Sequence, residues 1–493
     1  MDTRFAITEY PNAAALTAQL DALIKKPIYS INRAALKEYE QEYFEKKCAK
    51  SKGMITEAKE VIPGGVQHNL AFNYPFPIVM VKAKGNRLWD IDGNEYFDFL
   101  QAGGPTIIGS NDDVVKEEVK KLLDDCGPST GLFHPYEYKL AKKISECVPS
   151  VEMFRMLGSG TEACMCAVRV ARLATGHKNI IKMGGAYHGW SDQMAYGIRV
   201  NGTKFTQAHG VPLNCFMFIQ ETTPNDLDEL ERKLRLNQFR GGTAAVYMEP
   251  VGPESGTTPI TVEYVKGVER LCRKYGALLV FDEVVTGFRI GMAGAQGYFG
   301  VSPDLTIFGK VIAGGYPGAG GIGGKREYMK YLGAGLDSSG KKIHKALVGG
   351  TMTANPLSCC AGYFTLEEIE RTNACQKAGQ MGDRICAGLK ELVKKHGLPF
   401  VVWNTGSICH LETVGTMHYQ INWKKPWEIP TILGETGVRQ KEMEHMGAAY
   451  MAEGLVTLAG SRLYTSAAYT PKMIDQALAC FDRVFENVAV KAD

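Results

Sequence analysis

Residues 277–283 read ALLVFDE and residues 305–310 read LTIFGK, and these two stretches decide the fold. Each is an unbroken apolar run that ends in a charged residue. Three similar runs lie at 179–183, 216–220 and 244–250. Such runs are typical of strands that are buried on both faces of a parallel sheet. Amphipathic stretches separate several of them, so we predict an α/β protein whose parallel sheet is covered by helices on both faces.

The regions outside this pattern predict further parts of the chain. Residues 1–60 are polar with helical spacing and predict an N-terminal helical arm. Residues 103–370 form the predicted large domain. Residues 61–102 contain a hairpin signal at Asp92-Gly93, and residues 371–493 alternate helical and strand patterns. We therefore expect the segments 61–102 and 371–493 to combine into a small α+β domain.

Composition limits the function. The 493 residues include 56 Lys+Arg and 53 Asp+Glu, a formal charge of +3, which argues against a nucleic-acid or anionic-membrane partner. No apolar run is long enough to span a membrane. The 13 cysteines include no CxxC pair and indicate reduced thiols, with a zinc site or disulfides as the alternative. We expect a soluble cytoplasmic protein without a metal.

Two strand ends carry candidate catalytic groups. In parallel sheets, ligands bind beyond the carboxyl ends of the strands. Asp282 ends one apolar run, and Lys310 ends another. A lysine at a buried strand end can have a depressed pKa and attack a carbonyl carbon. Taken singly, such an aspartate is more often a helix cap or a solvated loop residue, and such a lysine is more often a surface residue.

A third strand end carries small hydroxyl residues. The segment 158–161, GSGT, directly precedes an apolar helical pattern, and its backbone N–H groups would make an anion site; a plain N-cap is the alternative. Tyr187 and His188 follow the run at 179–183. An anion cradle, an aromatic plate, a carboxylate and a lysine are together what pyridoxal phosphate requires.

Several motifs then carry a family resemblance. The chain resembles the class III, fold-type I pyridoxal-phosphate-dependent aminotransferases, and most of all their glutamate-1-semialdehyde 2,1-aminomutase branch. The resemblance implies a large domain with a mainly parallel seven-stranded sheet and a small domain built from both termini. The motifs, which follow the family's order, are IPGGV (62–66), GSGTEA (158–163), YHGW (187–190), NDLDEL (225–230), FDEVVTGFR (281–289), GK (309–310) and GGTMTANPLSCCAG (349–362).

The resemblance also implies roles for single residues. Lys310 would be the Schiff-base lysine, Asp282 the partner of the pyridine nitrogen, and Tyr187 the ring that stacks on the cofactor. Gly350 and Thr351 would reach the phosphate of the neighbouring subunit, which implies an obligate homodimer. The residues implied to bind pyridoxal phosphate or its pyridoxamine form are Ser159, Gly160, Thr161, Tyr187, His188, Asn225, Glu249, Asp282, Val284, Lys310, Gly350 and Thr351.

One departure from the family's pattern concerns the substrate. In the aminomutase branch, IPGGV is followed by an arginine that anchors the substrate carboxylate. This chain has His68 and Asn69 after IPGGV and no arginine. We expect Arg462 to be the alternative anchor, because a guanidinium binds a carboxylate bidentately; a surface position is the other interpretation. The stretch 190–214 takes the place of the branch's mobile gating loop.

The expected activity is that of an aminotransferase. An amino acid or amino-carbonyl compound would donate its amino group to a keto acid or aldehyde by way of Lys310 and pyridoxamine phosphate. Two alternatives share these residues: an intramolecular aminomutase of the glutamate-1-semialdehyde type, and an amino-acid racemase or epimerase. A catalytically inactive relative that serves as a scaffold is a further alternative, although it would have no need of both Lys310 and Asp282.

Overall fold

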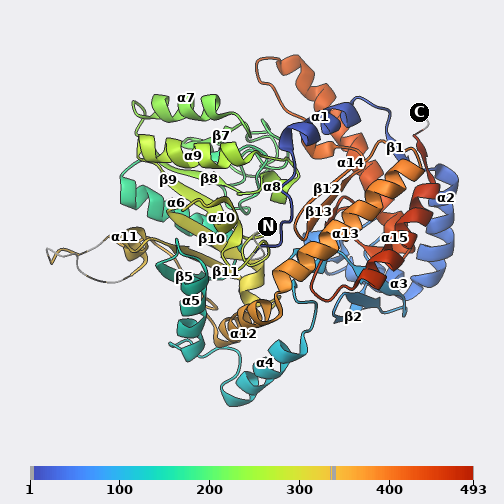
Figure 1. Ribbon diagram of the computed structural model, residues 1–493, viewed down its shortest axis with the longest axis horizontal. Coiled ribbons are helices and arrows are strands. Elements are labelled where there is room, and N and C mark those ends of the chain that lie inside the picture. The colour runs from blue at the N-terminus through green and yellow to red at the C-terminus, as the bar shows by residue number, and fades with distance from the viewer. Residues whose placement is uncertain (1–4, 334, 336–339, 343, 492–493) are drawn as a thin grey trace.

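The computed structural model describes residues 5–333, 335, 340–342 and 344–491. A seven-stranded sheet in the order β5-β11-β10-β9-β8-β6-β7 forms its centre (Figure 1). From β7 to β10 neighbouring strands run parallel, whereas β11 is antiparallel to both of its neighbours. The predicted mainly parallel sheet is thereby confirmed. Its strands are β5 (Met153–Leu157), β6 (Asn179–Met183), β7 (Ile219–Thr222), β8 (Thr243–Met248), β9 (Leu278–Asp282), β10 (Leu305–Gly309) and β11 (Gly320–Gly324).

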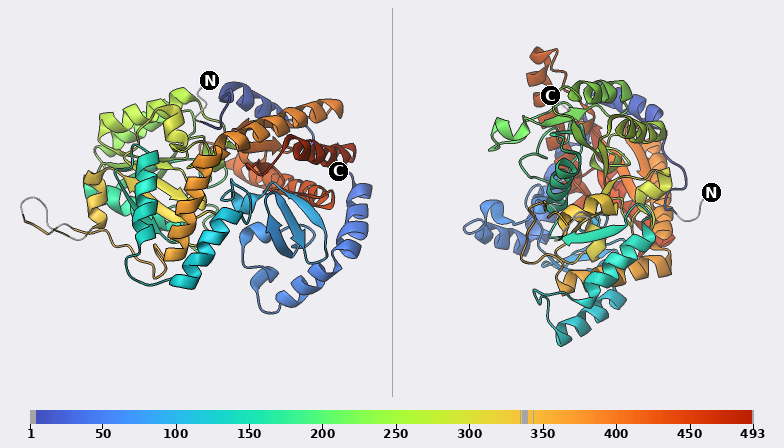
Figure 2. Two further views of the ribbon diagram at one scale, coloured as in Figure 1. Left: turned by 60° about the horizontal axis from the view of Figure 1, so that its bottom comes forward. Right: turned by 90° about the vertical axis from the view of Figure 1, so that its left-hand side faces the viewer.

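Helices cover both faces of this sheet, as successive residues of β8 demonstrate. Ala245 and Tyr247 pack with the apolar residues of α6 (Gly160–Thr175). Val246 and Met248 point the other way and pack with α7 (Leu227–Asn237) and α9 (Val262–Tyr275). Burial on both faces explains why the strands are continuously apolar. Figure 2 shows the sheet between these two helical layers.

The predicted strands agree with the observed ones except at one position. The runs at 179–183, 277–283 and 305–310 contain β6, β9 and β10, and the run at 244–250 covers all of β8 except Thr243. The prediction of a strand at 216–220 was wrong in its bounds, because β7 covers Ile219–Thr222. Residues 213–216 form a 3-10 turn that starts after Pro212, and this turn takes up the first part of the apolar run.

The second part of the molecule lies on the right of Figure 1 and combines segments from both ends of the chain. The Asp92-Gly93 hairpin is confirmed, since β3 and β4 pair antiparallel across it. One sheet has the order β14-β4-β3-β2 and another the order β12-β13-β15. The strands are β2 (Met80–Lys84), β3 (Arg87–Asp90), β4 (Glu95–Asp98), β12 (Val401–Thr405), β13 (Ile408–Glu412), β14 (Leu455–Val456) and β15 (Arg462–Tyr464).

Long helices pack on these sheets and connect them to the large one. α12 (Pro356–Thr372) packs on α4 (Asp113–Asp125) and α5 (Pro135–Cys147) beside the large sheet. It continues, after a left-handed residue at Asn373, into α13 (Ala374–Lys395), which packs on β12 and α15. The remaining elements here are α14 (Ile429–Ala452), α15 (Pro471–Glu486) and the short helices α8 (Pro253–Gly256), α10 (Gly294–Phe299) and α11 (Arg326–Met329).

The N-terminal residues are largely helical and wrap around the second part. They form α1 (Ala13–Ile24), α2 (Arg33–Glu38), a π-helical turn over Tyr39–Glu45 and α3 (Ala49–Ala58). β1 (Tyr29–Ile31) pairs with β16 (Val488–Val490) and so joins the two ends of the chain. All 13 cysteines are free thiols in the structure. Within the described residues, no helix has the length and apolar character needed to cross a membrane.

Candidate active site

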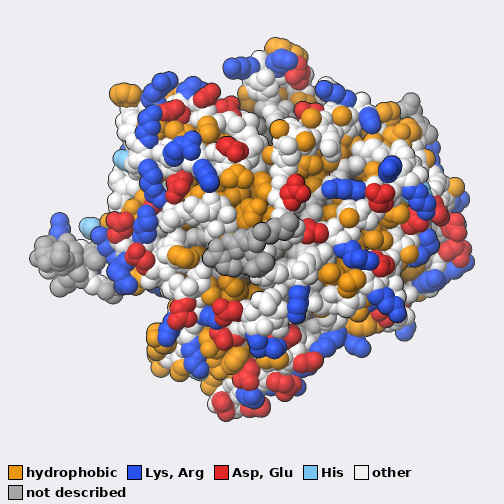
Figure 3. All heavy atoms as spheres, viewed as in Figure 1, with side chains coloured by type: hydrophobic (Ala, Val, Ile, Leu, Met, Phe, Trp, Pro, Cys, Tyr) orange, Lys and Arg blue, Asp and Glu red, His pale blue; other side chains and the backbone are white. Residues whose placement is uncertain are grey.

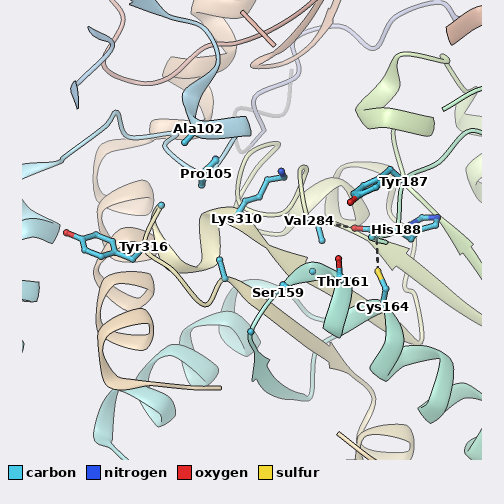
Figure 4. Close-up of a pocket in the computed structure, with 16 residues that line it drawn as sticks. Ala102, Pro105, Ser159, Thr161, Cys164, Tyr187, His188, Val284, Lys310 and Tyr316 are labelled. Atoms are coloured by element: carbon cyan, nitrogen blue, oxygen red, sulfur yellow. Dashed lines mark hydrogen bonds and ion pairs between the residues drawn. The ribbon is translucent and has the colours of Figure 1, made fainter. Parts of the chain in front are cut away.

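A pocket of about 320 Å³ opens at the carboxyl ends of the central strands (Figure 4). Strand ends and the turns after them supply most of its lining, because parallel strands place their carboxyl ends at one edge of the sheet. The pocket brings together many of the residues that the sequence singled out. These are Ser159, Gly160, Thr161, Tyr187, His188, Asp282, Val284 and Lys310.

Lys310 is the first residue of a 3-10 turn directly after β10. Its φ of 48° lies in the left-handed region, which is strained for a residue with a side chain. Within the described residues, no side chain or carbonyl forms a hydrogen bond or ion pair with Lys310 Nζ, and Figure 4 shows the side chain extending into the pocket. A strained lysine with an unengaged amine is suited to attack a bound ligand.

A turn of left-handed residues borders Lys310. Gln101, Ala102, Gly103 and Gly104 all have positive φ, from 49° to 116°. Glycine is favoured at the last position by its φ of 116°, whereas a Cβ there would make only ordinary van der Waals contacts. A Cβ on Gly104 would lie 3.5 Å from Cδ of Lys310 and 3.7 Å from Cζ of the Tyr464 ring. The turn thus lets the backbone approach the lysine closely.

Asp282 is fixed by three donors at the bottom of the pocket. His188 Nδ1 lies 2.7 Å from Asp282 Oδ2, and the Cys164 thiol lies 3.7 Å from the same oxygen. The backbone N–H of Val284 donates to Oδ1 at 3.0 Å. Burial lowers the pKa of His188, so the neutral imidazole donates its Nδ1–H to the carboxylate. The carboxylate is therefore oriented before any ligand binds.

The N-terminus of α6 forms another wall of the pocket. Ser159 is its N-cap, and its side chain accepts from the backbone N–H of Glu162 at 3.2 Å. The N–H groups of Gly160 and Thr161 belong to the first turn, where a helix has no internal acceptors for them. Together with the positive end of the helix dipole, they make a site for an anion.

A buried lysine positions the segment that carries Tyr187 and His188. Lys182 lies in β6, is completely buried, and its Nζ donates to the carbonyls of Ala186 at 2.9 Å and Met194 at 3.2 Å. Burial lowers its pKa to about 8. The sequence analysis missed this residue. Its signal is a lysine inside an otherwise apolar strand, NIIKM.

Glu249 and Asn225 do not line the pocket. Glu249 accepts from the backbone N–H of Tyr187 at 3.1 Å and also from those of Glu254 and Ser255. Burial and the nearby carboxylates of Asp282 and Glu254 raise its pKa to about 8. Asn225 accepts from the N–H of Thr261 and donates to a backbone carbonyl. Both side chains hold backbone rather than facing the pocket.

Arg462 is an internal residue that is paired with a carboxylate. Its guanidinium lies 3.2 Å from Glu254 Oε2 and 3.5 Å from the Tyr464 hydroxyl. Arg462 and Tyr464 share one face of β15. Although burial opposes it, the positive charges of Arg462 and Lys310 lower the pKa of Tyr464. Arg462 is thus connected to Lys310 through Tyr464, a residue that the sequence analysis did not select.

The segment after IPGGV supplies an apolar residue near the lysine. His68 and Asn69 are exposed at the start of a 3-10 turn over Asn69–Ala71. A Cβ placed on Gly103 would lie 3.0 Å from a Leu70 methyl and 3.9 Å from Lys310 Nζ. Leu70, rather than His68 or Asn69, therefore packs against Gly103 in the turn that borders Lys310.

Two further predicted residues and the expected loop lie away from the pocket lining. Gly350 and Thr351 are exposed. The stretch 190–214 consists mainly of turns, and its middle is attached to the C-terminal half of the chain. Ile421 donates its N–H to the carbonyl of Asn201 at 2.9 Å, and Trp423 Nε1 donates to the carbonyl of Gly202 at 2.7 Å.

Comparisons with known proteins agree with this geometry. Residues 70–459 match the family model described as aminotransferase class III. A glutamate-1-semialdehyde 2,1-aminomutase 2 of Shouchella clausii is 36% identical over 456 residues, which cover 90% of this chain and 99% of that protein. An omega-transaminase from Sphaerobacter thermophilus superposes with a TM-score of 0.77 at 26% identity, covering 90% of this chain and 99% of that one.

One more solved structure concerns the cofactor. A variant of a glutamate-1-semialdehyde-aminomutase from Pseudomonas aeruginosa PAO1, in complex with PMP, superposes with a TM-score of 0.75. It covers 95% of this chain and 98% of that one, and at 18% identity the likeness concerns the fold alone.

Proposed function

Because the chain belongs to the class III aminotransferase family and its cofactor is pyridoxal phosphate, we propose that it moves an amino group on substrates that carry a carboxylate. One observation supports this most strongly. Lys310 Nζ extends into the pocket that also holds the oriented carboxylate of Asp282, and it has no hydrogen-bond or ion-pair partner among the described residues. The donor set fits the cofactor, because the first turn of α6 offers N–H groups to a phosphate and Asp282 offers an acceptor to a pyridine nitrogen.

The residues of the pocket divide the work. Ser159, Gly160 and Thr161 bind the phosphate, and Tyr187 covers the ring. Asp282 accepts the N–H of the pyridine nitrogen and keeps that nitrogen protonated. When bound, the cofactor withdraws electrons from the carbon that bears the substrate's amine. Lys310 Nζ then takes the proton from that carbon and returns it at another carbon.

Arg462 is the proposed anchor for the substrate carboxylate. It shares the face of β15 with Tyr464, whose ring lies beside Gly104 in the turn that also borders Lys310. Its present partner is Glu254, and its Nε is buried without a hydrogen-bond partner in the described part of the chain. A guanidinium with an unused N–H donor can bind a second carboxylate or exchange its present carboxylate for another.

The intramolecular form of the reaction, an aminomutase of the glutamate-1-semialdehyde type, is the first candidate. It is supported by the names of the curated relatives, such as the one from Shouchella clausii. Transfer between two molecules is the second candidate. It is supported by the segment after IPGGV, where no arginine follows and the apolar Leu70 packs against Gly103.

One experiment tests the reaction and separates its forms. The purified protein with pyridoxal phosphate should show the yellow absorption of a lysine-bound cofactor, and Lys310→Ala should lose it. The enzyme is then incubated with glutamate-1-semialdehyde and with a panel of single-enantiomer amino acids, first without and then with a keto-acid acceptor. Isomerisation without an acceptor supports the aminomutase, and dependence on the acceptor supports the transferase. Inversion at the amino carbon, or a protein that stays colourless, would refute both.

We further propose that two copies of the chain complete each site. Gly350 and Thr351 are exposed although the family resemblance places them against a cofactor phosphate. Large apolar side chains close to them in the sequence are exposed, since Leu347 is 80% exposed and Met352 53%. Trp190, which directly follows the pocket residue Gly189, is 78% exposed. Exposed apolar residues of this size are typical of surfaces that a protein partner covers.

A further inference from the structure

We propose that a second pocket of this protein binds a small phosphorylated anion. This pocket is here called the basic pocket. Residues of β7 and α7 line it together with residues 420–424 from the C-terminal half of the chain. Its volume of about 650 Å³ is twice that of the candidate active site and falls within the range of small-molecule sites. None of the residues assigned to the amino-transfer reaction lines it, so the proposal does not depend on that reaction.

The lining of the basic pocket carries a surplus of positive charge. Two carboxylates, Glu221 and Glu229, oppose five cationic side chains. The surplus of three positive charges equals the formal charge of the whole chain. Elsewhere, on the face shown in Figure 3, Lys and Arg side chains are interspersed with Asp and Glu. The cationic side chains of the basic pocket are Lys204, Arg232, Lys233, Arg240 and Lys424.

Most of these cations are not neutralised within the chain. Glu229 forms a close ion pair with Lys233 at 2.7 Å and a longer one with Arg232 at 3.9 Å. Among the described residues, no carboxylate pairs with Lys204, Arg240 or Lys424. Lys204 Nζ lies 4.6 Å from the centre of the Trp423 ring. These three cations are therefore available to an anion. A phosphate suits them well, because it accepts several charge-assisted hydrogen bonds at once.

The carboxylate of Glu221 opposes an anion less than its formal charge indicates. The side chain is buried, and burial raises its pKa to about 7. One of its oxygens lies beneath Gly197, where a Cβ would clash with it, and has no hydrogen-bond partner in the described part of the chain. A protonated Glu221 adds no negative charge to the pocket.

The walls of the basic pocket are built by specific contacts. Gln220 and Asn237 exchange two side-chain hydrogen bonds of 3.1 Å, and Asn237 is buried. On the opposite side, the bond from Trp423 Nε1 to the Gly202 carbonyl fixes the C-terminal segment. A site with fixed walls loses little entropy when a ligand binds.

The basic pocket is connected to the candidate active site through one segment. Gly185 donates its N–H to the carbonyl of Gly197 at 2.9 Å, and Gly197 donates to the carbonyl of Lys204 at 2.6 Å. Residues 184–204 thus carry Tyr187 at one end and Lys204 at the other. An anion held by Lys204 would act on the segment that positions the stacking ring.

The test titrates the holoenzyme, in which pyridoxal phosphate already fills the α6 cradle, with pyrophosphate in a calorimeter. We expect one saturable site per chain that weakens with added salt. The double variant Lys204→Gln/Lys424→Gln should weaken binding by about tenfold or more, because charge-assisted hydrogen bonds are lost. The control Lys394→Gln/Lys472→Gln removes two exposed lysines on other helices and should bind as the wild type does.

Several results would overturn the proposal. They are the absence of saturable heat, unchanged binding in the test variant, equal losses in test and control variants, and release of the cofactor by pyrophosphate, which would place the anion in the active site. Thermal unfolding and the cofactor's absorption check that each variant is folded. If the double variant unfolds, Arg240→Gln serves in its place, with the same expected direction. ATP and adenosine complete the series: ATP should bind, and binding by adenosine in the absence of binding by pyrophosphate would refute a phosphate site.

Discussion

His188 Nδ1 and Asp282 Oδ2 lie 2.7 Å apart, and both side chains are buried. The imidazole therefore holds the carboxylate in the orientation that a pyridine nitrogen needs. Burial lowers the pKa of His188, so the ring stays neutral near pH 7 and its single Nδ1–H is directed at Asp282. Cofactor affinity should depend on this contact.

His188→Ala should weaken binding of pyridoxal phosphate by roughly tenfold to a hundredfold, because a hydrogen bond to a charged group contributes about 1.5–3 kcal/mol. Cofactor affinity is measured by titrating the apoenzyme and following absorbance. Cys164→Ala is the matched control. It removes a weaker thiol donor at 3.7 Å from the same oxygen, and its effect should be much smaller. Equal losses in the two variants would contradict the role given to His188.

The buried Lys182 should make stability rise with pH. Its pKa is lowered to about 8 in the folded protein against an ordinary value of 10.5, so above pH 8 the unfolded chain binds more protons than the native state does. Stability then increases as pH rises from 8 to 10.5. From pH 7.5 to 9.5 the free energy of unfolding of the wild type should gain about 1–2 kcal/mol relative to Lys182→Met.

Urea unfolding of both proteins at the two pH values measures this difference, and changes from titrating groups that do not interact with Lys182 cancel in it. The neutral amine keeps two N–H donors for the carbonyls of Ala186 and Met194, so the segment remains attached at high pH. An identical pH dependence in wild type and variant would show that Lys182 does not titrate in this range.

Arg462 and Glu254 should act on substrate binding in opposite directions. Arg462→Ala should raise KM for carboxylate-bearing substrates about tenfold to a hundredfold, as expected for the loss of a charge-assisted contact of about 1.5–3 kcal/mol. Glu254→Gln should lower KM, because it releases the guanidinium from its internal partner. Steady-state kinetics with a substrate that lacks a carboxylate are the control, and a KM that changes there as well would indicate a structural effect.

Leu70→Arg should improve the affinity for a substrate carboxylate. The new side chain would start against Gly103, in the turn that borders Lys310, where the chain now has a methyl group. We expect KM for glutamate-1-semialdehyde to fall by about tenfold. Leu70→Met, which keeps the volume and adds no charge, should leave KM unchanged. If Leu70→Arg gives no improvement, a carboxylate does not bind on this side of the pocket.

Mixed dimers test whether Thr351 serves the neighbouring site. Lys310→Ala and Thr351→Asp should each be inactive alone, the second because a carboxylate repels the phosphate. When the two are mixed and re-assembled, one site of each heterodimer contains Lys310 from one chain and Thr351 from the other. Activity should then return to about half of the wild-type value per heterodimer, since one site in two is restored. No recovery, or a protein that elutes as a monomer in size-exclusion chromatography, would refute the shared site.

The strand pattern predicted the sheet well because burial on both faces leaves an unbroken apolar run. The same reasoning placed Asp282 and Lys310 at one edge, since parallel strands end together. It failed at 216–220, where Pro212 and the turn after it use up apolar residues before β7 begins. Apolar character alone does not distinguish a turn against the core from a strand.

The contacts between distant segments could not be predicted. Lys182 resembles a lone polar residue in a strand until the carbonyls of Ala186 and Met194 are seen around it. Glu249 was expected near the ring, and its oxygens accept the backbone N–H groups of Tyr187, Glu254 and Ser255. In both cases the partners are backbone groups, which have no signature in the sequence.

The left-handed turn over residues 101–104 has a consequence for engineering. Ala102 carries its φ of 53° at a steric cost that glycine would not have. Lys310, with a φ of 48°, carries a second cost of the same kind in the same pocket. Selection for heat resistance would favour substitutions that release this strain. The stability gained in this way would come from the turn that borders the catalytic lysine. Thermal robustness and turnover should therefore trade against each other at this turn first.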